Sequence, residues 1–155
     1  MAGVLRLSHI GICVSDLERS LVFYRALGFE ERSRLRVSGE PPARLLELED
    51  VDLSAVYLER DGTRIELLHY PSPGHVGDGK AGPMNGLGLT HLSLRVADLD
   101  AVARALALAG GHILERSRIG IPAAKTRAVF ATDPDGTRIE LVEAPGDPDG
   151  LPGEG

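Results

Sequence analysis

One heptapeptide, DGTRIEL, occurs twice in this chain of 155 residues, at residues 61–67 and again at residues 135–141. The similarity extends beyond these letters, because residues 7–30 and 89–113 share one layout. Each stretch begins with Leu-Ser-His or Leu-Thr-His, continues as an apolar strand, reaches an Asp-Leu pair and then takes on helical periodicity. An offset of about half the chain is far longer than a solenoid repeat, so the pattern predicts two copies of one larger module.

The order of local signals within each copy predicts the fold. Ser15 and Glu18 form a capping box at the start of the first helix, and Asp98 caps the second helix. An Asp-Gly pair between two β-rich runs, which is a strong hairpin signal, precedes the final strand of each copy. The predicted class is therefore α+β, with two tandem βαβββ modules that form a curled mixed sheet around a metal cleft. A leucine-rich stretch at residues 39–50 adds a short helical insert to the first module.

These elements predict one domain with four parts. Module one covers residues 5–70, a linker rich in Gly and Pro covers 71–86, module two covers 87–144, and a flexible tail covers 145–155. Cys13 is expected to be a small buried thiol. The apolar faces of the helices and of the final strands predict the core, which comprises Leu17, Leu21, Ile65, Leu67, Leu99, Val102, Leu106, Ile139 and Leu141.

Composition excludes several classes of partner. The net charge is −6 without a basic run, which disfavours nucleic acid and anionic membranes. No apolar run approaches the roughly 20 residues of a membrane span. The single cysteine allows no internal disulfide, and no signal peptide is recognised, so we expect a cytoplasmic protein. With three Phe, three Tyr and no Trp, a stacking platform for flat ligands would be hard to build.

Four residues at matching places in the two modules predict a metal site. His9 and His91 open the first strands, whereas Glu66 and Glu140 lie in the middle of the final strands, on the face away from the helices. A carboxylate flanked by Ile and Leu is unfavourable to bury unless it is paired or bound to a metal. Two imidazoles and two carboxylates suit a divalent ion such as Ni, Co, Zn, Mn or Fe.

A purely structural alternative exists for each of these residues taken alone. A strand histidine is commonly a hydrogen-bonded core or rim residue, and a strand glutamate commonly points to solvent. Arg64 and Arg138 could neutralise Glu66 and Glu140 from two residues away on the same strand face. This alternative explains neither histidine.

The stretches LSHIGICVSDLERSLVFYRALGF, LTHLSLRVADL, GTRIELLHY and DPDGTRIELVE resemble the vicinal oxygen chelate superfamily. This superfamily includes glyoxalase I, methylmalonyl-CoA epimerase, extradiol dioxygenases and bleomycin- and fosfomycin-resistance proteins. The resemblance runs from Leu7 to about Glu143 and implies metal ligands at His9, Glu66, His91 and Glu140.

That resemblance implies a metal-dependent isomerase, epimerase or lyase of the glyoxalase or methylmalonyl-CoA epimerase type, which acts through a metal-chelated enolate of a small carbonyl substrate. Two alternatives stay open: a protein that sequesters an antibiotic or toxic metabolite in the same cleft, and a single-domain metal-dependent dioxygenase. We expect a homodimer, with the cleft completed within one chain or across two. Of the two catalytic candidates, Glu66 and Glu140, the sequence favours Glu140 as a mobile base, because its neighbours predict a drier setting.

Overall fold

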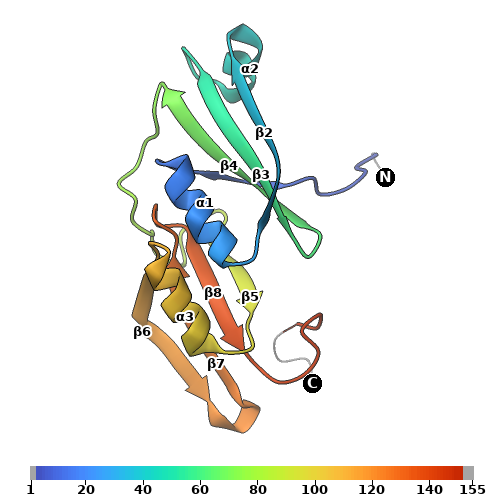
Figure 1. Cartoon of the computed structure of the whole chain (residues 1–155), viewed down its shortest axis with the longest axis vertical. Coiled ribbons are helices and arrows are strands. Elements are labelled where there is room, and N and C mark those ends of the chain that lie inside the picture. Colours follow the sequence, from blue (N-terminus) through green and yellow to red (C-terminus); the bar gives the residue numbers. More distant parts are fainter. Residues whose placement is uncertain (1–2, 152–155) are drawn as a thin grey trace. The chain divides into compact units, whose positions relative to one another are not determined.

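The computed structural model describes residues 3–151 and divides into two compact units, Met1–Gly77 and Asp78–Gly155. The division falls inside the predicted linker at residues 71–86. Each unit contains four strands in one mixed sheet and one helix of ten residues (Figure 1). The predicted α+β class with two tandem βαβββ modules is confirmed.

The first unit follows the βαβββ order with one insertion. Its strands form a sheet in the order β1-β4-β3-β2, in which β1 runs parallel to β4 and the remaining neighbours are antiparallel. The helix α2, at the position of the predicted insert, stands between β2 and β3. The elements are β1 (Ile10–Cys13), α1 (Leu17–Ala26), β2 (Glu30–Ser38), α2 (Glu40–Leu46), β3 (Asp52–Arg60) and β4 (Thr63–Ser72).

The second unit repeats this topology without the insertion. Its sheet has the order β5-β8-β7-β6, and β5 is parallel to β8. The elements are β5 (His91–Arg95), α3 (Leu99–Leu108), β6 (His112–Ile121), a 3-10 turn η1 (Pro122–Ala124), β7 (Thr126–Thr132) and β8 (Arg138–Glu143). In both units the first strand therefore lies directly beside the last and parallel to it, so the start of the module lies close to the beginning of its last strand.

Helix capping confirms one prediction and corrects another. The carboxylate of Asp98 accepts a hydrogen bond from the backbone N–H of Ala101 at 2.8 Å, as predicted for α3. The N-cap of α1 is Asp16, which accepts from the backbone N–H of Arg19 at 3.0 Å, so the predicted capping box of Ser15 and Glu18 is wrong. Serine and aspartate are both favourable N-cap residues, and the helix begins one residue later than the sequence pattern predicted.

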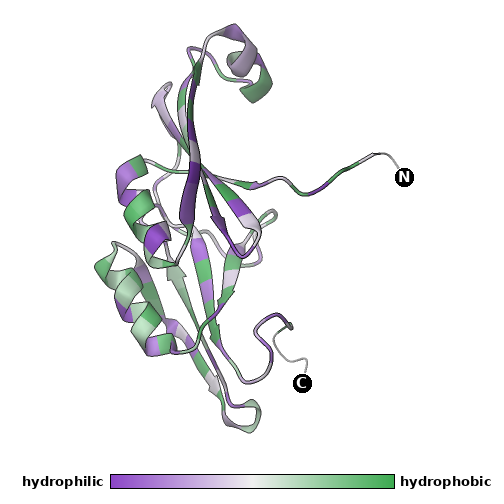
Figure 2. Ribbon diagram, turned by 45° about the vertical axis from the view of Figure 1, so that its right-hand side comes forward, coloured by the Kyte–Doolittle hydropathy of each residue, from purple (hydrophilic) through white to green (hydrophobic). Residues whose placement is uncertain are grey.

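Each unit buries an apolar layer between its helix and one face of its sheet. Apolar and polar side chains alternate along the strands, so one set of residues in β4 and β8 faces the helices (Figure 2). Leu17 and Val102 are only half-buried, and Cys13 is exposed rather than buried. The other predicted core residues are fully buried, namely Leu21, Ile65, Leu67, Leu99, Leu106, Ile139 and Leu141.

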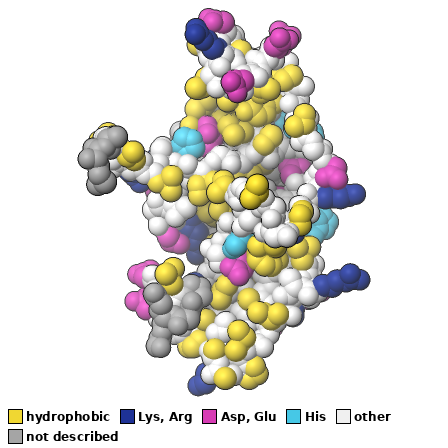
Figure 3. Space-filling model, turned by 180° about the vertical axis from the view of Figure 1, so that it is seen from behind, with side chains coloured by type: hydrophobic (Ala, Val, Ile, Leu, Met, Phe, Trp, Pro, Cys, Tyr) yellow, Lys and Arg dark blue, Asp and Glu magenta, His cyan; other side chains and the backbone are white. Residues whose placement is uncertain are grey.

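A second apolar cluster lies in the first unit, next to the insert. Its buried members are Val51, Leu53 and Ala55, and the helix α2 contributes Ala43 and Leu46 to it. The leucine-rich insert is thus held by apolar contacts to the sheet. Seen from behind, the first unit shows hydrophobic side chains gathered on the side opposite α1 (Figure 3).

A group of charged residues recurs in both units beside the start of the helix. In the first unit Arg34 pairs with Glu31 at 2.6 Å and with Glu18 of α1 at 3.0 Å. In the second unit Arg118 pairs with Glu115 at 2.7 Å and with Asp100 of α3 at 3.0 Å.

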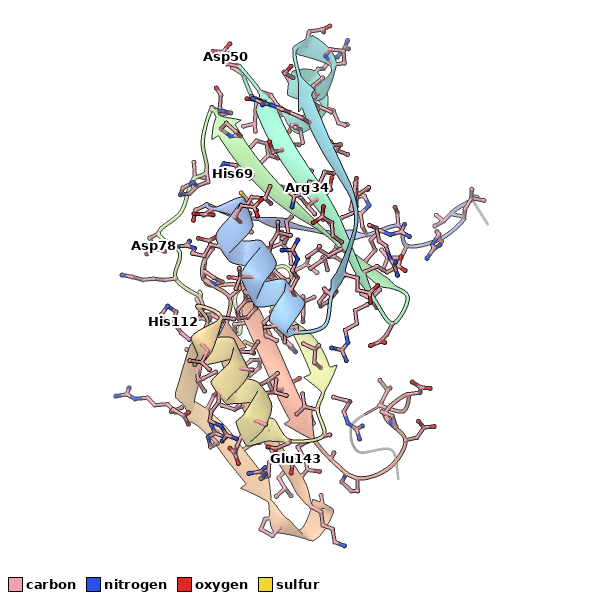
Figure 4. The ribbon with its side chains drawn as sticks, viewed as in Figure 1. Arg34, Asp50, His69, Asp78, His112 and Glu143 are labelled. Atoms are coloured by element: carbon pink, nitrogen blue, oxygen red, sulfur yellow. The ribbon has the colours of Figure 1, made fainter. Side chains whose placement is uncertain are left out.

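In the first unit Arg25 of α1 also pairs with Glu31 at 2.9 Å, whereas in the second unit the group is extended at the helix start. Arg127 joins Asp100 at 2.8 Å to Glu143 at 2.7 Å. Glu143, which is labelled at the end of β8 in Figure 4, also accepts from the backbone N–H of Leu99. The sheet and the helix start of the second unit are therefore more extensively cross-linked by charge.

The chain after β8 is tied back to the second unit. The guanidinium of Arg95 donates to the carbonyl oxygens of Ala144 and Pro145 at 3.0 and 3.1 Å. Residues 152–155 of the predicted tail lie outside the described part of the chain. Among the described helices, none is long and apolar enough to cross a lipid bilayer.

Candidate functional site

The first unit brings His9 and Glu66 together. His9 directly precedes β1, and the parallel register of β1 with β4 places Gly11 opposite Glu66. The His9 Nε2 atom lies 3.1 Å from Glu66 Oε2, and its Nδ1 lies 3.0 Å from the hydroxyl of Ser8. The ring of Tyr57, which pairs with Glu66 across β3 and β4, packs edge-on against the imidazole at a centroid distance of 5.2 Å.

The second unit builds an equivalent pair from His91 and Glu140. His91 Nε2 lies 3.6 Å from Glu140 Oε2, and His91 Nδ1 lies 2.8 Å from the hydroxyl of Thr90. Phe130 packs edge-on against His91 at 5.3 Å, as Tyr57 does in the first unit. Here the carboxylate is held by Ser93, whose hydroxyl donates to Glu140 Oε2 at 2.6 Å.

The surroundings of the two glutamates differ in exposure. The side chain of Glu66 is 13% exposed and that of Glu140 is 28% exposed, so the drier setting predicted for Glu140 is wrong. An aromatic ring lies opposite each glutamate, Tyr57 on β3 and Phe130 on β7. Burial, followed by a hydrogen bond to Glu66, raises the pKa of the Tyr57 phenol, so this hydroxyl stays protonated and can donate to the carboxylate.

The sequence left open a salt bridge between Glu66 and Arg64, but the structure gives Arg64 a different partner. The guanidinium of Arg64 binds Glu59 on the neighbouring strand at 2.8 Å. Glu66 instead faces an imidazole nitrogen and a phenol. A salt bridge from Arg64 therefore does not account for the position of Glu66.

The spacing of each pair fits two neighbouring ligands of one metal ion. Nitrogen and oxygen ligands bound at about 2.0–2.2 Å and at right angles lie about 3 Å apart. The observed separations of 3.1 and 3.6 Å are close to this value. A hydroxyl on Nδ1 also suits metal binding through Nε2, because it fixes the ring and can accept the remaining proton.

Convergence of all four ligands on one ion remains a prediction. Within residues 3–151 no three or more His, Cys, Asp and Glu side chains gather into one metal-binding group. The structure brings the predicted residues together as two pairs, one in each unit.

Sequence reasoning missed four hydroxyl-bearing residues around these pairs. Ser8 and Thr90 could have been found from the sequence, because each directly precedes the histidine of its repeat. Tyr57 and Ser93 could not be found by aligning the repeats, because Phe130 and Gly11 occupy the equivalent positions. Only the strand register shows that each glutamate has a hydroxyl beside it.

Comparison with known proteins identifies the family. A family profile described as the Glyoxalase/Bleomycin resistance protein/Dioxygenase superfamily matches residues 6–141. Over 145 residues the chain is 28% identical to mitochondrial methylmalonyl-CoA epimerase from Bos taurus, covering 90% of this chain and 74% of the relative. It is 31% identical over 145 residues to the uncharacterized protein YaeR of Escherichia coli K12, covering 92% and 99% of the two chains.

Solved structures agree on the fold. A glyoxalase family protein from Bacillus cereus superimposes with a TM-score of 0.81 at 24% identity, covering 94% of this chain and 99% of that one. The repeated βαβββ topology, the match to the family profile and the relatives lead to one conclusion. The chain belongs to the Glyoxalase/Bleomycin resistance protein/Dioxygenase superfamily, the vicinal oxygen chelate proteins.

Proposed function

We propose that this protein is a divalent-metal-dependent isomerase or epimerase that moves a proton next to the carbonyl group of a small substrate. His9, Glu66, His91 and Glu140 are the proposed ligands of one ion, which is Ni, Co, Zn, Mn or Fe. The observation that carries the proposal is the repetition of the pair: both units place an imidazole Nε2 beside a carboxylate oxygen and a hydroxyl beside Nδ1.

The imidazoles are set up to act as neutral ligands. A neutral ring has one N–H and one lone pair, and the hydroxyls of Ser8 and Thr90 can accept the N–H of Nδ1. Each Nε2 lone pair is then directed toward the neighbouring glutamate, where an ion would lie. A bound ion would supply Lewis-acid stabilisation of negative charge on a substrate oxygen.

Glu140 is the proposed general base. The reason is no longer low exposure, which was predicted wrongly, but the position of its carboxylate. The Oε2 atom of Glu140 lies 3.6 Å from Nε2 of His91, whereas the corresponding distance from Glu66 to His9 is 3.1 Å. The side chain of Glu140 is also more exposed than that of Glu66. A carboxylate that turns away from its histidine can take a proton from the carbon beside a carbonyl. Glu66, which is covered by Tyr57, stays in place as a ligand.

The relatives support this reaction class. Methylmalonyl-CoA epimerases from Bos taurus and Homo sapiens are 28% and 26% identical to this chain and each align with 90% of it. Small acyl-CoA thioesters are therefore the first substrates to test, followed by hemithioacetals. We propose a homodimer as the active form, in which the ligands of one ion come from one chain or from two.

Solvent-deuterium exchange tests the proposal. The full chain is stripped with a chelator, reloaded separately with each of the five ions and incubated with candidate substrates in D₂O. We expect metal-dependent incorporation of deuterium beside the substrate carbonyl, which is lost in His9→Ala and His91→Ala. Tight substrate binding without exchange would favour the sequestering alternative, and oxygen consumption would favour the dioxygenase.

A further inference from the structure

Each glutamate of the candidate site has one hydroxyl beside it, but the two hydroxyls come from different strands. In the first unit the hydroxyl belongs to Tyr57 on β3, and the residue opposite Glu66 on β1 is Gly11. In the second unit it belongs to Ser93 on β5, and the residue opposite Glu140 on β7 is Phe130. The hydroxyl therefore comes from opposite sides of the strand that carries the glutamate. It comes from the β3 side of β4 in the first unit and from the β5 side of β8 in the second.

We propose that Tyr57 and Ser93 are positioning residues that orient Glu66 and Glu140 for the metal ion and leave the two carboxylates with different freedom. The inference rests on the proposed function. Side chains opposite each other on neighbouring strands are close enough for a hydroxyl on either side to reach the central carboxylate. Such charge-assisted hydrogen bonds are short and roughly twice as strong as neutral ones, and the 2.6 Å contact from Ser93 is one of them.

In the first unit one side chain contacts both donors. The ring of Tyr57 packs against His9 at 5.2 Å, and its hydroxyl binds Glu66. The geometry of the pair is therefore fixed as a whole, which agrees with its short separation of 3.1 Å and the low exposure of Glu66.

In the second unit the same contacts are divided between two side chains. Phe130 packs against His91, whereas Ser93 holds Glu140 through Oε2, the oxygen that also faces His91. Loss of the serine hydroxyl releases the carboxylate and leaves the imidazole supported. The hydroxyl of Ser93 thus orients the Glu140 carboxylate independently of the side chain that supports His91.

The exchange can be rebuilt experimentally if the Leu68 side chain shifts by a few tenths of an ångström. A Cβ atom on Gly11 would lie 3.2 Å from the Cδ1 atom of Leu68, which is the end of a flexible side chain. Gly11 is not among the residues with positive φ, so serine is compatible with its backbone. The double variant G11S/Y57F therefore gives the first unit the hydroxyl arrangement of the second, and S93G/F130Y makes the opposite change.

Calorimetric titration of the full chain with Ni²⁺ tests the proposal. We expect Tyr57→Phe and Ser93→Ala each to weaken nickel binding about 10- to 100-fold, as is typical when the partner of a metal ligand is removed. G11S/Y57F and S93G/F130Y should recover affinity to within a few-fold of the unaltered chain. Tyr70→Phe is the matched control, since it removes a phenol hydroxyl four residues along β4 from Glu66 and should leave affinity unchanged.

Kinetics separate positioning from packing. With a substrate that shows exchange, Ser93→Ala should lower kcat by a larger factor than Tyr57→Phe, because only Ser93 holds the proposed base. A chain that binds no nickel at all would overturn the proposed function together with this inference. If the unaltered chain binds nickel, the positioning role alone is overturned when Y57F and S93A both keep the affinity of the unaltered chain. It is also overturned when the exchanged variants recover no affinity.

Discussion

The two histidine–glutamate pairs share their donor atoms but differ in what surrounds them. Parallel pairing of the first and last strands fixes the donors, β1 with β4 in one unit and β5 with β8 in the other. The supporting hydroxyl comes from Tyr57 in one and from Ser93 in the other, and the pairs measure 3.1 and 3.6 Å. A duplicated fold therefore preserves the positions of the histidine and the glutamate through backbone register, while the hydroxyl beside the glutamate comes from a different strand in each unit.

The charged groups at the helix starts also combine a part that both units share with a part that differs between them. An arginine on the second strand joins an acid on that strand to an acid in the first helical turn in both units, through Arg34 and through Arg118. Arg127 extends the group in the second unit alone. The shared part fixes the helix start, and the added arginine is expected to make the second unit more sensitive to acid.

The largest expected effect distinguishes the two glutamates. Glu140→Gln should keep part of the metal binding yet lose about 100- to 10,000-fold in turnover, which is the usual contribution of a general base. Glu66→Gln should lose less turnover because this residue is a ligand only. Metal content and kcat are measured on the same preparations. Equal loss of metal in both variants, without a separation of binding from rate, would show that both glutamates are plain ligands.

A smaller effect compares the two apolar cores. Leu21 in α1 and Leu106 in α3 are fully buried, so truncation of either to Ala should lower the free energy of unfolding by about 2–5 kcal/mol. Val22 and Leu108 lie on the same helices and are 57% and 91% exposed, so their Ala variants should change it by less than about 0.5 kcal/mol. Denaturant melts measure the free energy of unfolding of all four variants. Equal decreases at the buried and the exposed positions would refute the assigned helix faces.

The smallest effect concerns acid stability. Hydrogen bonds from Arg127 lower the pKa of Glu143 and of Asp100, whereas Arg34 lowers that of Glu31 in the first unit. Carboxyls with a depressed pKa stabilise the fold above their ordinary pKa of about 4, and this contribution is lost as the pH falls below it.

Arg127→Met should therefore flatten the fall of Tm between neutral and acid pH more than Arg34→Met does. The exposed Arg116→Met, which removes the same charge, serves as the control and should keep the slope of the unaltered chain. A slope in R127M that matches the control would show that the network adds no acid-sensitive stability.

The sequence predicted the two modules and the positions of the four candidate site residues because the same motifs occur twice. The period of apolar residues located the buried faces of α1 and α3, and the shared Leu-Ser/Thr-His and Arg-Ile-Glu motifs located the histidines and glutamates. The N-cap at Asp16 was missed because Ser15 is an equally good cap by type. The relative exposure of Glu66 and Glu140 was predicted wrongly because it depends on neighbours across the sheet rather than along the chain.

The stoichiometry of metal binding tests the central claim most directly. The full chain, stripped of metal, is titrated with Ni²⁺, and bound metal is counted by elemental analysis in the unaltered protein, His9→Ala and His91→Ala. If the two pairs are ligands of one ion, the unaltered protein binds one ion per chain and either variant loses it. Two ions per chain, with each variant retaining one, would show that the pairs are independent sites and would contradict the account.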